Sequence, residues 1–220
     1  MWTHYLKTAW RSLWKQKGFT VINILGLAIG ITCCLLILMY VWDESSYDRF
    51  FDKGERIFRV GLERKYPGRE SFYAIIPASY AQAIKDECAE VEEVTRLFYF
   101  QDFTPIYKIG TTTFEEAKTI WADSTFFDLF NLPVLKGDAH AALVKPNGVI
   151  ITEHVAKKYF GNEDPLGKIL DIPNTEDDLV VSAVCSDVPA NSHLLFDLVV
   201  SSKNLGFLNE PNFDMEIEEK

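Results

Sequence analysis

The longest run of apolar residues in the chain lies near its start. From Phe19 to Trp42 the sequence contains no charged side chain. A helix of about 24 residues is about 36 Å long, which is enough to cross a hydrocarbon core of about 30 Å. A buried core helix would normally carry charge on one face. The run therefore predicts a transmembrane helix over residues 19–42.

A cleavable signal peptide is the main alternative interpretation of this run. The apolar region of a signal peptide spans about 7–15 residues and ends at a small-residue cleavage site. Here the run is longer, and it ends in the bulky sequence Leu38-Met-Tyr-Val-Trp42. We therefore expect a permanent anchor.

Residues 1–18 have the period of an amphipathic helix. One face carries three tryptophans and the opposite face carries three cations. These residues are Trp2, Trp10 and Trp14, and Lys7, Arg11 and Lys15. Tryptophans at headgroup depth and cations facing anionic lipid are typical of a helix that lies in the membrane interface. We expect the six residues to contact membrane lipid from the cytoplasmic side.

The predicted span contains a G-x-x-x-G motif formed by Gly26 and Gly30, with Asn23 and Thr32 as polar neighbours. Small residues four apart allow another helix to approach closely, so both glycines are candidate helix-packing residues. Glycine is also common in membrane helices that make no such contact. The motif alone leaves both interpretations open.

The remaining residues, 43–220, mix short strand-like and helix-like patterns and contain no second long apolar run. This mixture predicts an α+β domain, and two strand–helix–strand units would fit two lobes. Predicted strands cover residues 56–63, 91–100, 112–122, 149–152, 179–188 and 194–201. One predicted helix begins at Pro77 and has Tyr80, Ala83, Ile84 and Cys88 on its buried side. A second follows a cap at Asp123-Ser124 and places Phe126, Phe127 and Phe130 in the core. A third begins after residue 152 and ends at Phe160.

Charge is distributed unevenly along the chain, whose net charge is -10. Four cations and no acid precede the apolar run, and acids dominate the residues just after it. This asymmetry places the N-terminus in the cytoplasm and the body outside it. An acidic body also argues against a nucleic-acid partner, because phosphates require a basic surface.

The sequence from Tyr159 to Ile169, YFGNEDPLGKI, is superficially similar to a phosphate-binding loop. Five residues rather than four separate Gly161 from Gly167, and Ile169 stands where a magnesium-binding hydroxyl is required. Two acids in the loop would repel phosphate. We therefore expect a turn between a helix and a strand, and no nucleotide cofactor.

Ser192, His193 and Asp197 have the residue types of a hydrolase triad. Adjacent side chains rarely face each other, however, and no nucleophile elbow surrounds the serine. Residues 187–193 are better interpreted as a loop between two strands, and we expect no catalytic residues in this chain.

The four cysteines and four histidines lack the spacing of a zinc site. Cys88 and Cys185 form a disulfide in an oxidising compartment or remain buried free thiols. The second alternative is favoured, because Cys185 shares a predicted strand face with Leu179, Val181 and Ala183.

Several motifs in order resemble those of MacB-like (FtsX-like) ABC transporter permeases, most closely the versions found in Bacteroidetes-type bacteria. The resemblance runs from residue 1 to about residue 205. The motifs are Trp10-Arg-Ser-Leu-Trp14, KGFTVINILGLAIG at 17–30, DESSYD at 43–48, ERIFRV at 55–60, ITE at 151–153, AKKYFGNEDPLGK at 156–168 and DVPANSH at 187–193.

The resemblance implies an inner-membrane protein whose periplasmic domain acts mechanically and has no catalytic residues. Implied partners are an ATP-binding subunit, a second permease copy or a related permease, and a periplasmic adaptor or outer-membrane protein. A stand-alone, single-pass binding or sensor module is the alternative. Family permeases continue into further membrane helices, whereas residues 209–220 are acidic and polar. We therefore expect a fragment, a truncated gene product or one part of a split permease.

Overall fold

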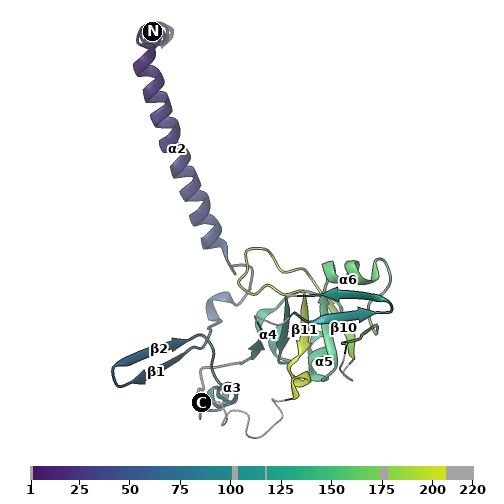
Figure 1. Ribbon diagram of the computed structural model, residues 1–220. Coiled ribbons are helices and arrows are strands. Elements are labelled where there is room, and N and C mark those ends of the chain that lie inside the picture. The colour runs from purple at the N-terminus through teal and green to yellow at the C-terminus, as the bar shows by residue number, and fades with distance from the viewer. Residues whose placement is uncertain (1, 101–103, 117, 174–177, 207–220) are drawn as a thin grey trace. The chain divides into compact units, whose positions relative to one another are not determined.

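The computed structural model describes residues 2–100, 104–116, 118–173 and 178–206 (Figure 1). The chain divides into two compact units, Met1–Tyr47 and Asp48–Lys220. The expected acidic segment at residues 209–220 lies outside the described residues. The two units are taken separately below.

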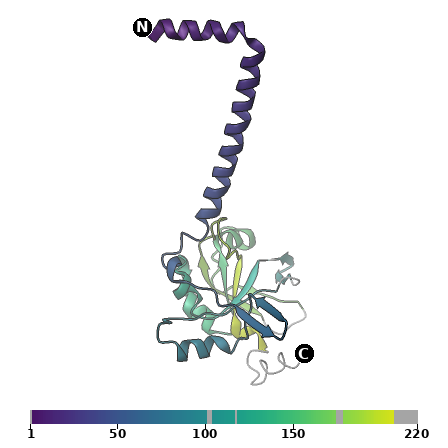
Figure 2. The ribbon, with the colours of Figure 1, turned by 90° about the vertical axis from the view of Figure 1, so that its left-hand side faces the viewer.

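The first unit consists of two helices, α1 (Trp2–Lys15) and α2 (Lys17–Ser46), which are separated at Gln16 (Figure 2). Within the described part of the chain, α2 is the one helix long and apolar enough to cross a membrane. It extends beyond the predicted span at both ends. The Thr32 hydroxyl donates to the Ala28 carbonyl at 2.8 Å, so this polar group is satisfied within the helix.

The second unit is built on a mixed β-sheet with the strand order β3-β6-β11-β8-β10-β7, and β9 pairs with β10. The strands are β3 (Leu97–Phe98), β6 (Thr119–Ala122), β7 (Val134–Gly137), β8 (Gly148–Thr152), β9 (Ile169–Leu170), β10 (Leu179–Cys185) and β11 (Leu198–Ser201). β11 runs parallel to β6 and antiparallel to β8, and β8 runs parallel to β10. The α+β class is confirmed.

Helices cover both faces of this sheet (Figure 1). α4 (Phe126–Phe130) and α5 (Ala139–Val144) pack on one face, and α6 (Glu153–Phe160) packs on the other. Ile150 of β8 belongs to the first core cluster, whereas Val149 and Ile151 belong to the second. A strand buried on both faces must be apolar at every position, which explains the run of Val and Ile.

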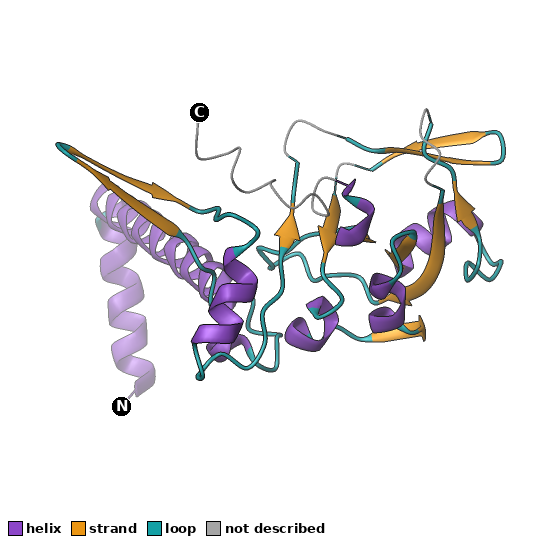
Figure 3. Ribbon diagram, turned by 90° about the horizontal axis from the view of Figure 1, so that it is seen from below, coloured by secondary structure: helices purple, strands orange, loops and turns teal. Residues whose placement is uncertain are grey.

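Two hairpins and a short helix complete the second unit. β4 (Ile106–Ile109) pairs with β5 (Thr112–Glu115), and β1 (Leu62–Tyr66) pairs with β2 (Arg69–Tyr73). The helix α3 (Tyr80–Glu87) follows β2, and single 3-10 turns occupy Gly54–Arg56 (η1) and Ser202–Asn204 (η2). In Figure 3 the β1–β2 hairpin extends away from the main sheet.

Five of the strand predictions were wrong in extent: those at 179–188 and 194–201 differ from β10 and β11 by three or four residues at one end, and three others differ more. The strand predicted at 56–63 begins only at Leu62, the one at 91–100 is reduced to Leu97–Phe98, and the one at 112–122 is split between β5 and β6. β5 and β6 belong to different sheets. The apolar alternation was present in each case, but a strand also requires a partner with free backbone groups at that position.

The predicted cap at Asp123-Ser124 was also wrong. The N-cap of α4 is Thr125, which makes no side-chain capping bond. Asp123 instead accepts hydrogen bonds from Arg96, which lies 27 residues earlier in the chain. A long-range charged partner has displaced the local capping interaction.

All four cysteines are free, and they differ in exposure. The predicted burial of Cys185 is confirmed, and burial raises the pKa of its thiol to about 12. The predicted burial of Cys88 was wrong, because α3 leaves this end of its predicted core face exposed. A bulge between Val181 and Ala183 also moves Cys185 to the opposite face from Leu179.

The helix-to-strand turn predicted in YFGNEDPLGKI is confirmed. Residues 161–168 connect α6 to β9, and the Gly167 amide donates to the Val181 carbonyl at 2.8 Å. The Lys168 ammonium lies 2.9 Å from the Glu163 carboxylate. The lysine is thus paired within its own turn.

Candidate functional site

The candidate site begins where the second unit begins, at Asp48. Asp48 follows Tyr47, the C-cap residue of α2. It is bound by Asn191, Ser192 and His193, and we call these four residues the Asp48 clasp. The clasp joins two sequence motifs, at 43–48 and 187–193, that are about 140 residues apart in the chain.

The clasp uses both carboxylate oxygens and the backbone of Asp48. Ser192 Oγ donates to Oδ1 at 2.7 Å, the His193 amide donates to Oδ1 at 3.1 Å, and His193 Nδ1 lies 2.8 Å from Oδ2. The Asp48 amide donates to the Asn191 carbonyl at 3.1 Å. Asp48 has φ 56°, a left-handed conformation that Asp and Asn tolerate better than most side chains.

Segment 50–52 attaches the chain to the body at two further points. The Phe51 side chain is buried, and its ring centroid lies 5.2 Å from that of Phe130. Asn131 Nδ2 donates to the Asp52 carboxylate at 2.7 Å. The segment forms one wall of a groove of about 860 Å³ that reaches Asp187 and Pro189 of the clasp loop. The chain is therefore held to the body from Asp48 to Asp52.

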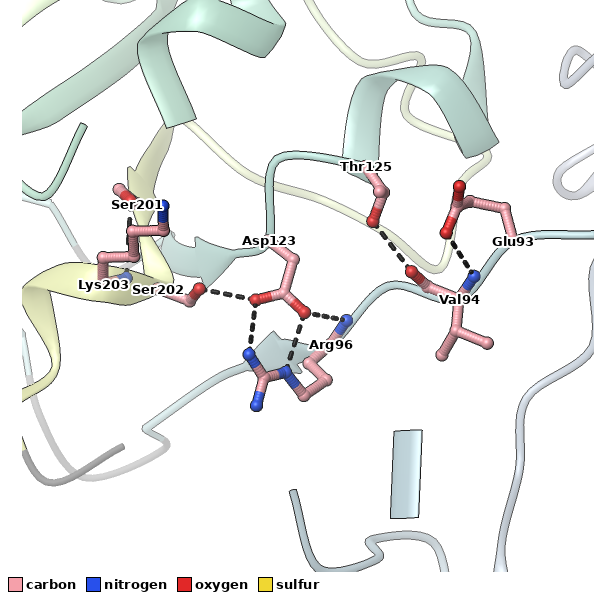
Figure 4. Close-up of polar contacts among 8 residues, drawn as sticks. All are labelled: Glu93, Val94, Arg96, Asp123, Thr125, Ser201, Ser202 and Lys203. Atoms are coloured by element: carbon pink, nitrogen blue, oxygen red, sulfur yellow. Dashed lines mark hydrogen bonds and ion pairs between the residues drawn. The ribbon is translucent and has the colours of Figure 1, made fainter. Parts of the chain in front are cut away.

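A second polar cluster, the Asp123 bracket, joins Arg96, Asp123 and Ser202 (Figure 4). Arg96 Nε and Nη2 donate to the two Asp123 carboxylate oxygens at 2.8 and 3.0 Å. The Arg96 amide and Ser202 Oγ donate to the same carboxylate at 3.1 and 2.6 Å. Paired hydrogen bonds between a guanidinium and a carboxylate fix orientation as well as distance.

The clasp loop and the bracket lie at opposite ends of the sheet. In the ladders, Leu97, Ala122 and Ser201 are aligned at one end, next to the bracket residues Arg96, Asp123 and Ser202. At the other end, β10 finishes at Cys185 and β11 starts at Leu198, so the loop between them, with Ser192 and His193, leaves and returns there. β11 thus connects the two clusters over about 13 Å of strand.

Ser192, His193 and Asp197 do not have the geometry of a hydrolase triad. Ser192 and His193 both bind Asp48 rather than Asp197, and the Ser192 hydroxyl donates to a carboxylate oxygen. A nucleophilic serine needs its proton directed to an imidazole nitrogen. Among the described residues, no group of His, Cys, Asp and Glu side chains is arranged to hold a metal ion. The contacts of Ser192 and His193 with Asp48 therefore have a structural role.

A buried acid of the second unit, Glu116, is also hydrogen-bonded by neighbouring side chains. Glu116 accepts hydrogen bonds from Lys158 Nζ at 2.5 Å and from the Tyr159 hydroxyl at 2.8 Å. Burial, together with the hydrogen bond to Glu116, raises the pKa of Tyr159 well above its usual value. The tyrosine therefore remains protonated and available as a donor.

The membrane-segment residues singled out from the sequence lie in the first unit. Trp2, Trp10 and Trp14 are exposed on α1, and the Lys17 ammonium lies 5.1 Å from the Trp14 ring centroid. On α2, no atom lies within 4 Å of the position that a Cβ would take at Gly26 or Gly30. Both glycines thus leave an open helix surface, and their packing role stays a prediction.

The sequence did not indicate the clasp or the bracket as sites. Residues 43–48 and 187–193 were noticed only as motifs, and no spacing rule relates residues so distant in the chain.

The described residues thus combine an apolar N-terminal helix long enough to cross a membrane with a mixed α/β sheet domain. The family model described as MacB-like periplasmic core domain matches residues 20–212. The chain belongs to this family, which comprises periplasmic domains of ABC transporter permeases. No curated protein matches the chain by sequence.

Three solved structures are similar to part of the chain. A permease-protein domain from Porphyromonas gingivalis is 27% identical, with a TM-score of 0.54, covering 60% of this chain and 55% of its own. The periplasmic region of MacB from Actinobacillus actinomycetemcomitans is 20% identical, with a TM-score of 0.47, covering 60% and 57%. The extracellular domain of the ABC-type transporter YknZ from Gram-positive bacteria is 18% identical, with a TM-score of 0.44, covering 61% and 66%. The chain thus spans between about half and two thirds of each of these solved chains.

The stability of the clasp is expected to depend on pH. Partial burial raises the pKa of Asp48, but the hydrogen bonds from Ser192 and His193 outweigh this effect and hold the pKa below its usual value. A lowered pKa stabilises the fold above the unfolded-state pKa, and this contribution is lost as the pH falls through the folded-state pKa. Asp48→Asn should therefore cost about 1 kcal/mol near pH 7 and much less near pH 3, measured by urea unfolding. An equal cost at both pH values would contradict this account.

Proposed function

We propose that this domain relays motion from the membrane segment to the periplasm, driven by ATP hydrolysis in a partner subunit. The observation that carries the proposal is the Asp48 clasp. A displacement of the chain at Asp48 acts directly on the loop that leads into β11, and β11 ends at the Asp123 bracket. Packed strands do not deform continuously, so they transmit a displacement rather than absorb it.

In this proposal the Asp123 bracket passes the displacement of β11 to the residues that precede β3. Asp123 holds Arg96, which directly precedes β3, and the Thr125 hydroxyl donates to the Val94 carbonyl at 2.8 Å. Residues 93–97 connect backwards to α3 and the β1–β2 hairpin. Movement of β11 would therefore reposition the segment that carries this helix and hairpin, which is the more exposed part of the unit.

The membrane segment has a matching role in the proposal. α2 spans the bacterial inner membrane with its N-terminus in the cytoplasm, and α1 lies in the interface through Trp2, Trp10, Trp14, Lys7, Arg11 and Lys15. Gly26 and Gly30 provide the surface for a second membrane helix. The partners are an ATP-binding subunit, a second permease copy or a related permease, and a periplasmic adaptor or outer-membrane protein.

The test measures whether ATP changes the domain through the clasp. The permease is purified from its native membranes with its bound ATPase, and hydrogen exchange of residues 198–206 is followed with and without ATP. We expect an ATP-dependent change in the wild type that Asp48→Ala abolishes while ATP hydrolysis continues. Asp164→Ala is the matched control, because it removes an exposed carboxylate that pairs with Lys136 and lies outside the clasp and the bracket.

Two outcomes would count against the relay. Hydrogen exchange across β8 is measured in the same experiment, because it distinguishes unfolding of the Asp48→Ala protein from uncoupling. A folded Asp48→Ala protein with an unchanged response to ATP would refute the role of the clasp. A wild type without any response to ATP would favour a stand-alone binding or sensor module.

A further inference from the structure

Residues 57–61 have the sequence of a strand but no strand partner. Phe58, Val60 and Leu62 alternate with Arg59, Gly61 and Glu63. Ile57 has extended dihedral angles, φ -97° and ψ 123°, yet the β1–β2 ladder stops at the Leu62–Tyr73 pair. Within the described chain, no strand pairs with residues 57–61, and β1 pairs only with β2. Among the described residues, no strand therefore lies along the side of residues 58–66 that faces away from β2, and we call this side the open edge (Figure 3).

This open edge carries large apolar side chains. Phe58 is 82% exposed and Val60 is 48% exposed. Their alternation places them on one side of an extended chain. An unpaired strand edge with exposed apolar side chains is a template for another strand, and a two-stranded hairpin alone is marginally stable in water.

The charge of residues 58–66 indicates what kind of strand would pair with this edge. Arg59, Arg64 and Lys65 outnumber Glu63, in a chain whose net charge is -10. A second copy pairing antiparallel about Leu62 would place Arg59 opposite Lys65, which is destabilising, whereas the register about Gly61 would place Arg59 opposite Glu63. An acidic strand would instead place carboxylates against these cations.

We propose that residues 58–66 accept an extended strand from a partner protein whose side chains alternate between apolar and acidic. The apolar side chains would cover Phe58, Val60 and Leu62, and the carboxylates would pair with Arg59 and Lys65. Backbone hydrogen bonds along the edge supply affinity, and the side-chain alternation supplies specificity. This surface is separate from the clasp and the bracket, so it stands or falls independently of the relay.

The experiment uses a fluorescent eight-residue peptide of alternating valine and glutamate, with the full chain in detergent micelles and no ATP. Binding is followed by fluorescence anisotropy. The expected result is saturable binding that weakens about tenfold when lysine replaces glutamate in the peptide. Phe58→Ser should weaken binding about fivefold, because it removes an apolar contact.

Phe72→Ser is the matched control, since Phe72 is 76% exposed but lies on β2 rather than on the open edge. It should leave the affinity unchanged. The proposal is overturned if the wild type does not bind, if both peptides bind equally, or if Phe58→Ser and Phe72→Ser have the same effect. Self-association of the chain that Phe58→Ser abolishes would also overturn it, in favour of pairing between two copies.

Discussion

Replacing Asp123 by alanine is expected to lower the free energy of unfolding by about 2–4 kcal/mol. The substitution removes the carboxylate that accepts from Arg96 and Ser202. Ser202 is buried and would lose an acceptor, while the Arg96 side chain is 35% exposed and can partly rehydrate. This exposure keeps the expected cost below that of a fully buried ion pair. Pulse proteolysis across a urea series measures the change.

Asp164→Ala provides the comparison for the bracket. The Lys136–Asp164 pair has a similar separation of 3.0 Å, but its side chains are 53% and 65% exposed. Exposed ion pairs contribute little, so the expected loss is much smaller than that for Asp123→Ala. Equal losses for Asp123→Ala and Asp164→Ala would show that the bracket is not a stabilising network.

The second large effect is expected at Gly148, the first residue of β8. A Cβ at this position would lie 1.8 Å from the Ala142 carbonyl oxygen and 2.8 Å from its carbon. The obstacle is the backbone of α5, which cannot move without displacing Ala142 and Leu143 from the core. Gly148→Val should cost more than about 4 kcal/mol, which is a large share of the stability of a typical domain.

The expected readout for Gly148→Val is loss of protease-resistant protein and of slow hydrogen exchange in β8, β10 and β11. Gly206→Ala is the control, because no atom lies within 4 Å of the corresponding Cβ position. A Gly148→Val protein with native exchange rates would mean that α5 and β8 are not packed as closely as described.

The central strands of the sheet were predictable from the sequence, and the reason is burial. β8 and β10 are covered on both faces, so nearly every position is apolar and the pattern is unambiguous. The turn after α6 was equally predictable, because Gly161 and Gly167 have φ of 60° and 77°, which favour glycine. Local chemistry was sufficient in both places.

The polar clusters could not be predicted, because each depends on where distant segments meet. Nothing near Asp48 in the sequence indicates Ser192, and nothing near Asp123 indicates Arg96. The exposed face of α3 was missed for the same reason. Its pattern was that of a core helix, but burial of Tyr80 and Cys88 requires a neighbouring surface that the described residues do not supply.

β11 has a consequence for how this domain can vary in length. Leu198 and Val200 belong to one core cluster, and Val199 belongs to the other. One inserted or deleted residue would exchange these side chains between the two faces and would also move Ser202 out of register with Asp123. Homologous sequences should therefore accumulate insertions in the turn at Pro67–Gly68, between β1 and β2, while the number of residues from Leu198 to Ser202 stays constant.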